Sequence, residues 1–241
     1  MNLYNQIYRR KSCRKYQMEP LSAALLQEIE DFISKMQSLL PQVTVSHRIV
    51  GQAEIKGFMP LVPKAPHYVA LSGKSQPYRD LCAGFLFQQL DLYISARGLG
   101  SCWLGAAKGR ETSAGEDTIL TISFGEPAEA ATRTLAEFQR KPLAEIASGE
   151  DARLEAVRLA PSGLNAQPWY FVAQGGVIHV YRVVPSKLKA MLYSFQELDV
   201  GIALCHLALA SEAEGKPFRF ETTHPDVLPA PRGFAYVGTV M

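Results

Sequence analysis

The sequence predicts an α+β fold. Helical and strand-like segments alternate along its 241 residues, but without the regular strand–helix–strand spacing of a parallel, doubly wound sheet. Two long apolar helices also share residues at matching positions, which indicates that one structural unit is used twice. The length allows one large domain or two small ones.

Composition and charge narrow the class of protein. The 25 Lys and Arg residues nearly balance the 23 Asp and Glu residues, which argues against a nucleic-acid-binding protein. The four cysteines are widely spaced and no metal-binding pattern is present, so we expect no metal. No apolar run approaches the ~20 residues of a membrane helix, and the first residues resemble no signal peptide. These features predict a soluble cytoplasmic protein.

The first half predicts two helices and three strands. Ser22 is placed to cap a helix over residues 21–36, and Pro41 closes that segment. Strands are expected at residues 43–50 and 67–71. An apolar helix follows over residues 81–96, ending at Gly98, and then a strand over 119–124.

The second half predicts a similar set of elements. A helix over residues 151–159 is stopped by Pro161, and a hairpin pairs residues 169–173 with 177–181 around two glycines. An apolar helix over residues 198–214 and a strand over 234–240 complete the chain.

Two sequence matches indicate an internal repeat. Residues 84–98 (GFLFQQLDLYISARG) resemble 201–215 (GIALCHLALASEAEG), with glycines at both ends. Residues 65–68 (APHY) resemble 167–170 (QPWY), each opening a strand. We therefore expect two divergent repeats, residues 1–138 and 139–241, that form a pseudo-dimer within one chain. The seam between such units is a natural ligand cleft.

Three segments carry the polar groups of a candidate site. Residues 10–14 (RKSCR) offer the guanidinium, ammonium and hydroxyl donors that bind a phosphate, although a solvated basic turn would have the same composition. Residues 98–105 (GLGSCWLG) lack the third glycine of a dinucleotide turn. Their glycines indicate either close approach to a flat ligand or a helix stop before a buried tryptophan. Residues 161–169 (PSGLNAQPW) suit the edge of a planar heterocycle, or form an ordinary turn.

Together, five segments resemble the FMN-dependent nitroreductase family: RRKSCR at 9–14, GLGSCWLG at 98–105, FGEP at 124–127, RKPL at 140–143 and APSGLNAQPW at 160–169. Their order is similar to that of its tandem-repeat nitroreductase subfamily. The resemblance implies a nitroreductase-like fold, an FMN cofactor, and NAD(P)H as the reductant. It also implies a small-molecule electron acceptor of the nitroaromatic or quinone type.

The resemblance also implies which residues bind FMN. It places the following around the cofactor: Arg10, Lys11, Ser12, Arg14, the backbone of Leu104 and Gly105, Arg140, Pro161, Ser162, Asn165 and Gln167. No separate catalytic residue is required, because the flavin carries the hydride chemistry. Arg14 is the first candidate to stabilise negative charge on the reduced ring, and Lys11 is the second.

The two halves differ in these motifs, so we expect one flavin site per chain, at the seam between the repeats. A non-catalytic flavin-binding or sensor protein, and a scaffold that has lost the cofactor, are the alternatives. A monomeric pseudo-dimer is expected, with further dimerisation left open. Cys13 and Cys102 are interpreted as buried hydrophobic residues, and His206 as a hydrogen-bonded core residue.

Overall fold

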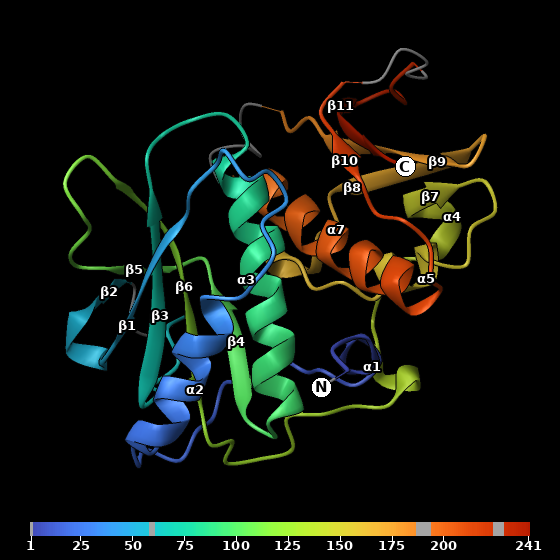
Figure 1. Cartoon of the computed structure of the whole chain (residues 1–241). Helices are drawn as coiled ribbons and strands as arrows, with labels where there is room; N and C mark the ends of the chain where they lie inside the picture. The colour runs from blue at the N-terminus through green and yellow to red at the C-terminus, as the bar shows by residue number, and fades with distance from the viewer. Residues whose placement is uncertain (1, 58–60, 187–193, 224–228) are drawn as a thin grey trace.

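The structure is a computed structural model that describes residues 2–57, 61–186, 194–223 and 229–241. Two long helices, α3 (Arg79–Ala96) and α7 (Gln196–Ala213), cross at the centre, with one β-sheet beside each of them (Figure 1). Side chains from both helices and both sheets form one hydrophobic core. Because α3 and α7 are buried around most of their circumference, their sequences are apolar on nearly every face.

The first sheet has four antiparallel strands in the order β1-β3-β6-β4. These are β1 (Ser46–Val50), β3 (His67–Gly73), β6 (Asp117–Gly125) and β4 (Gly100–Leu104). A two-stranded ribbon of β2 (Ile55–Gly57) and β5 (Ala107–Gly109) lies next to it.

The second sheet has the order β10-β11-β9-β8-β7. Its strands are β10 (Phe220–Glu221), β11 (Phe234–Val240), β9 (Val177–Val183), β8 (Trp169–Gln174) and β7 (Ala147–Ser148), and only the β7–β8 pair is parallel. The α+β class predicted from the sequence is therefore confirmed.

The other helices of the described residues are shorter than α3 and α7. They are α1 (Tyr4–Ile7), α2 (Ala23–Ile33), α4 (Leu143–Ile146), α5 (Leu154–Arg158) and the 3₁₀ turns η1 (Gln52–Glu54), η3 (Leu135–Glu137) and η4 (Gly163–Asn165). The Ser22 side chain caps α2 by accepting a hydrogen bond from the Leu25 N–H at 3.2 Å, as predicted.

Most of the predicted elements are present, with different ends. The hairpin at residues 175–176 is confirmed, and both glycines have positive φ, as a tight hairpin turn requires. The helix expected over residues 151–159 shortens to α5. No strand was predicted over residues 98–105, but this segment contains strand β4, which pairs with β6.

The two sheets share one chain order. In chain order, the elements β1, β3, α3, β4 and β6 correspond to β8, β9, α7, β10 and β11. With this correspondence, matching strands have matching neighbours in the two sheets, and all of these strand pairs are antiparallel. In this correspondence β8 occupies the place of β1, whereas β3 matches β9. The expected match of residues 65–68 with 167–170 is therefore wrong, because those segments open non-equivalent strands.

A reciprocal glycine contact lies where α3 crosses α7. A Cβ atom added to Gly84 would lie 1.9 Å from the Leu198 carbonyl oxygen, and one added to Gly201 would lie 2.0 Å from the Leu81 carbonyl oxygen. The helices approach so closely that only hydrogen fits at either position. The crossing is symmetric in detail, because each glycine meets the carbonyl three residues before the other.

We predict that Gly84→Ala destabilises the protein by about 1–3 kcal/mol or more, because its methyl group meets backbone that cannot move aside easily. Urea unfolding measures this change in the free energy of unfolding. Gly51→Ala is the control, since no atom lies within 4 Å of the Cβ it would add. Equal stabilities for the two variants would contradict a tightly packed crossing.

Candidate functional site

A groove lies between an N-terminal arm, residues 10–16, and the loop of residues 161–167. It consists of two adjoining cavities, an inner one of about 110 Å³ and an outer one of about 400 Å³. Five lining residues are common to both cavities, namely Ser12, Arg14, Pro161, Ser162 and Leu164. The groove therefore joins the arm and the loop, which lie about 150 residues apart in the sequence.

The two cavities differ in chemistry. The inner cavity is walled largely by apolar and aromatic side chains, which include Trp103, Leu120, Phe195, Leu198 and Ile202, and also by Gly105 and Asp199. The outer cavity adds Lys11, Arg133, Arg140 and Asn165. An apolar end and a cationic end thus share one opening.

The arm lies along the outer edge of β4. The Cys13 N–H donates to the Ser101 carbonyl at 2.8 Å, and Ser12 bridges to Ser101 in parallel register. At Gly100, an added Cβ would lie 2.6 Å from the Cys13 sulfur. This glycine therefore makes room for the arm, and the expectation that the glycines of this segment admit a flat ligand is wrong for Gly100.

Arg10 anchors the arm from within the core. Its Nε lies 3.1 Å from Asp91 Oδ2, and the two side chains are 4% and 0% exposed. The Ser101 hydroxyl donates to the other Asp91 oxygen at 2.6 Å. The Arg10 guanidinium also reaches the Ser12 hydroxyl, at 3.4 Å. Arg10 does not line the groove, and its guanidinium instead holds Ser12 in place.

The cations of the outer cavity have no acidic partner. Among the described residues, Lys11, Arg14, Arg133 and Arg140 form no ion pair with a carboxylate. Burial, together with the charge of Arg10, lowers the pKa of Arg133 to about 10. Burial and the charges of Arg133, Arg10 and Arg158 lower that of Arg140 to about 9. The Glu137 charge offsets only part of this effect on Arg133, and the remaining positive charge favours a bound anion.

The loop of residues 161–167 has unusual backbone geometry. Leu164, Asn165 and Gln167 have φ values of 52°, 55° and 45°, in the left-handed region that non-glycine residues rarely adopt. Leu164 is also 87% exposed. Strained backbone of this kind concentrates at functional sites.

Hydrogen bonds hold this loop in place. Asn165 accepts from Arg140 Nη1 at 2.6 Å and donates to the Gln139 carbonyl at 2.6 Å. The Ser162 hydroxyl accepts from the Gln167 N–H at 2.9 Å. The Gly163 N–H donates to Asp199, a residue of the first turn of α7.

Two further residues that were expected at the site lie outside its lining. Gln167 is buried, accepts from the Lys141 N–H at 2.8 Å and donates to the Arg158 carbonyl at 3.4 Å. Leu104 is buried in β4, and it is the next residue, Gly105, that reaches the inner cavity. Gly105 faces Phe195, whose ring would lie 2.8 Å from an added Cβ. Eight of the eleven expected residues therefore line the groove. The other three, Arg10, Gln167 and Leu104, are buried in the core.

A chain of neutral hydrogen bonds runs behind the inner cavity. Trp103 Nε1 donates to Gln88 Oε1 at 3.1 Å, and Gln88 Nε2 contacts His206 Nε2 at 3.2 Å. His206 Nδ1 donates to the Ala156 carbonyl at 2.9 Å, which leaves Nε2 to accept. His206 is therefore a hydrogen-bonded core residue, as predicted.

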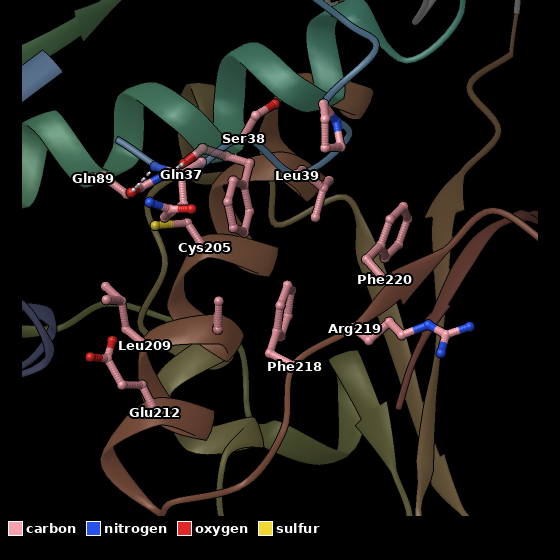
Figure 2. A pocket seen from close by; sticks show the side chains of 13 residues that line it. Gln37, Ser38, Leu39, Gln89, Cys205, Leu209, Glu212, Phe218, Arg219 and Phe220 are labelled. Carbon is pink, nitrogen blue, oxygen red and sulfur yellow. Dashed lines mark hydrogen bonds between the residues drawn. The ribbon is translucent and has the colours of Figure 1, made fainter. Parts of the chain in front are cut away.

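A second cavity of about 460 Å³ lies on another face, between α3, α7 and the segment that leads into β10 (Figure 2). Leu39, Phe85, Phe218 and Phe220 are among its lining residues. Its single lining cation, Arg219, points away from the cavity and pairs with Glu221. This cavity therefore lacks the cationic end that distinguishes the groove.

Sequence reasoning missed several groove residues. The motifs do not include Arg133 or Phe195, and Leu164 was not singled out within its motif. Asp199 looks like an ordinary residue of a helix N-terminus. The acidic residue in a nearly continuous apolar helix was the available signal for Asp199.

No cluster of three His, Cys, Asp or Glu side chains in the described part of the chain could hold a metal ion. Over the same residues, none of the helices combines the length and the hydrophobicity needed to cross a membrane. All four cysteines, Cys13 and Cys102 among them, are buried free thiols, as predicted for those two.

The α+β fold and the groove beside its central helix pair agree with the resemblance to the nitroreductase class. The family model described as "putative TM nitroreductase" matches residues 2–211, so the chain belongs to this family and is an oxidoreductase. No curated protein matches the chain.

The chain is similar to solved structures. A putative nitroreductase from Thermotoga maritima is 19% identical, with a TM-score of 0.69, and the match covers 100% of this chain and 93% of that one. A nitroreductase family protein from Clostridium difficile is 19% identical with a TM-score of 0.49, over 63% of this chain and 99% of that one. A likeness at this level of identity shows the fold alone.

We predict that Asp91→Asn destabilises the protein by about 3–5 kcal/mol, because it leaves the buried Arg10 without its counter-charge. Urea unfolding measures the loss. Glu129→Gln breaks the exposed pair with Lys15 and should cost less than about 1 kcal/mol. A small effect of both substitutions would show that Arg10 does not depend on Asp91.

We predict that His206 makes stability fall with acid. Burial lowers its pKa to about 3, whereas a histidine in the unfolded chain titrates near its ordinary value of 6.5. Below about pH 6.5 the unfolded state therefore binds a proton that the folded state does not. The free energy of unfolding should fall by about 1.4 kcal/mol for each further pH unit.

The comparison is with His206→Gln, which lacks this proton. Between pH 6.5 and 5, urea unfolding should show that the wild type loses about 2 kcal/mol more than the variant. Parallel pH dependences would mean that His206 is charged in the folded protein.

Proposed function

We propose that this protein is an FMN-dependent oxidoreductase whose cofactor lies in the groove. The observation that carries the proposal is the groove's polarity, with an apolar, aromatic-walled inner cavity opening onto a cluster of unpaired cations. FMN has the same polarity, since a flat ring system is joined through a ribityl chain to a phosphate. A buried Arg140 Nε without a partner in the described residues also fits a ligand that brings acceptor oxygens.

The residues divide between the two ends of the cofactor. Lys11 and Arg140, with Arg133, would bind the phosphate, and Ser12, Ser162 and Asn165 would contact the middle of the ligand. Pro161 and the backbone of Gly105 would border the ring. Arg10, Leu104 and Gln167 are best described as supports for these residues, because their side chains face the core.

Arg14 lines both cavities, so it would lie beside the ring as well as the phosphate. A fixed guanidinium there stabilises negative charge on a reduced ring. Lys11 lines the outer cavity alone, which favours a phosphate contact and leaves Arg14 as the stabilising residue.

Bound FMN would supply the hydride chemistry, accepting electrons from NAD(P)H and passing them to a small oxidised molecule. Family membership supports a nitroaromatic or quinone-like acceptor. The chain's own contribution is to hold the ring, leave one face open and exclude water from the inner cavity. The buried free thiols agree with the reducing conditions of the cytoplasm.

We also propose that the chain is a fusion of two divergent repeats, with a boundary near residues 138–139. Equal chain order in the two sheets and the reciprocal Gly84–Gly201 contact support it. The pseudo-dimer would then hold one flavin, because the second cavity has no free cation for a phosphate. A single chain would suffice as the functional unit.

We predict that Lys11→Ala weakens FMN binding about tenfold or more and leaves riboflavin binding unchanged. The lost interaction is a charged hydrogen bond to phosphate, worth about 1.5–3 kcal/mol. Quenching of flavin fluorescence measures both affinities. The control is Lys15→Ala, an exposed cation that pairs with Glu129 and does not line the groove. Equal losses for FMN and riboflavin would place the phosphate elsewhere.

Turnover tests the enzymatic part of the proposal. With FMN bound, NADH or NADPH should be consumed continuously in the presence of menadione or a nitroaromatic compound. Flavin binding without such consumption would instead indicate a non-catalytic flavin-binding protein.

A further inference from the structure

Asp199 is an acidic residue inside the apolar end of the groove. It lies in the first turn of α7, is 1% exposed and lines the inner cavity beside Trp103 and Ile202. Its two carboxyl oxygens lie 3.1 Å and 3.3 Å from the nitrogen of Gly163, at the start of the strained turn.

This carboxyl group has little to stabilise a charge. Among the described residues, Gly163 N–H is its single hydrogen-bond donor, and no cation lies within ion-pair distance. Burial raises the pKa of Asp199 well above its ordinary value, and the one hydrogen bond offsets only part of that effect. Burial without a counter-charge favours the neutral acid, which has an O–H to donate as well as an oxygen to accept.

The equivalent position in α3 shows that a hydrogen bond between the start of such a helix and the preceding loop does not require a carboxyl group. Asp199 is the fourth residue of α7, and Cys82 is the fourth residue of α3. The Leu40 backbone N–H, in the loop before β1, donates to the Cys82 sulfur. That loop corresponds to the loop before β8. Of these two equivalent positions, the one beside the groove therefore has a carboxyl group, and the other has a thiol.

We propose that Asp199 is a ligand-contacting residue: a neutral carboxylic acid that accepts from the Gly163 N–H with one oxygen and donates from the other to an acceptor atom of the planar ring in the inner cavity. This inference rests on the proposed function, because the ring is taken to be that of the flavin. A carbonyl oxygen or an unprotonated ring nitrogen has the required chemistry.

Two consequences follow for the site. The Gly163 contact holds the turn in which Leu164 and Asn165 have left-handed backbone, so Asp199 also positions Asn165 opposite Arg140. The hydrogen bond to the ring strengthens as the acceptor atom gains negative charge, so it makes the ring easier to reduce.

Two substitutions at Asp199 test the proposal. Asparagine has the shape and the donor–acceptor pattern of a neutral carboxylic acid, whereas leucine has neither donor nor acceptor. Asp199→Asn should keep the FMN dissociation constant within about threefold of wild type. Asp199→Leu should raise it about tenfold and lower the midpoint potential of the bound flavin. Circular dichroism of both variants verifies folding.

Infrared spectroscopy supplies a readout without turnover. The wild type should show the C=O band of a protonated carboxyl group that is absent in Asp199→Asn, and this band should shift when FMN binds. A shift that needs added menadione would assign the contact to the electron acceptor and overturn the flavin contact. Absence of the band, or equal impairment of the Asn and Leu variants, would also overturn the proposal. If the wild type itself binds no FMN, the proposed function fails first and this inference fails with it.

Discussion

The close packing of α3 against α7 determines where everything else in this molecule lies. Glycine at positions 84 and 201 lets the two backbones meet at hydrogen-atom distance, and each helix then carries its own sheet. The N-terminal arm lies along β4, which follows α3, and the strained turn lies against the first turn of α7. The groove exists because the crossing brings these two distant segments together.

Buried polar contacts then give the groove its chemistry. Asp91 neutralises the charge of Arg10 inside the core and so anchors the arm. The other cations of the arm lie at the surface, where their charges remain in contact with water. The cations around the outer cavity have no acidic neighbours in ion-pair contact among the described residues, while the inner cavity is apolar except for a few polar groups. This separation of charge from apolar surface is what matches a ligand with a phosphate at one end and a flat ring at the other.

The sequence could predict the secondary structure well where periodicity was strong, as in α3, α7 and the hairpin at residues 175–176. It missed short strands that depend on their neighbours. No strand was predicted at β4, because the arm that covers Gly100 is distant in sequence. The motifs include most of the groove-lining residues, but they could not separate these from residues buried in the core. Arg10 and Lys11 are adjacent, yet one is paired with Asp91 in the core and the other lines the outer cavity. Asp199 carried no motif, and its burial beside Gly163 is visible only in the structure.

The central claim is that one chain has a single groove that holds FMN between two dissimilar halves. Isothermal titration calorimetry of the purified, flavin-free protein with FMN tests it most directly. The account requires saturation at one FMN per chain, with the protein remaining a monomer competent to bind. Two FMN per chain, one FMN shared by two chains, or no binding at all would contradict it.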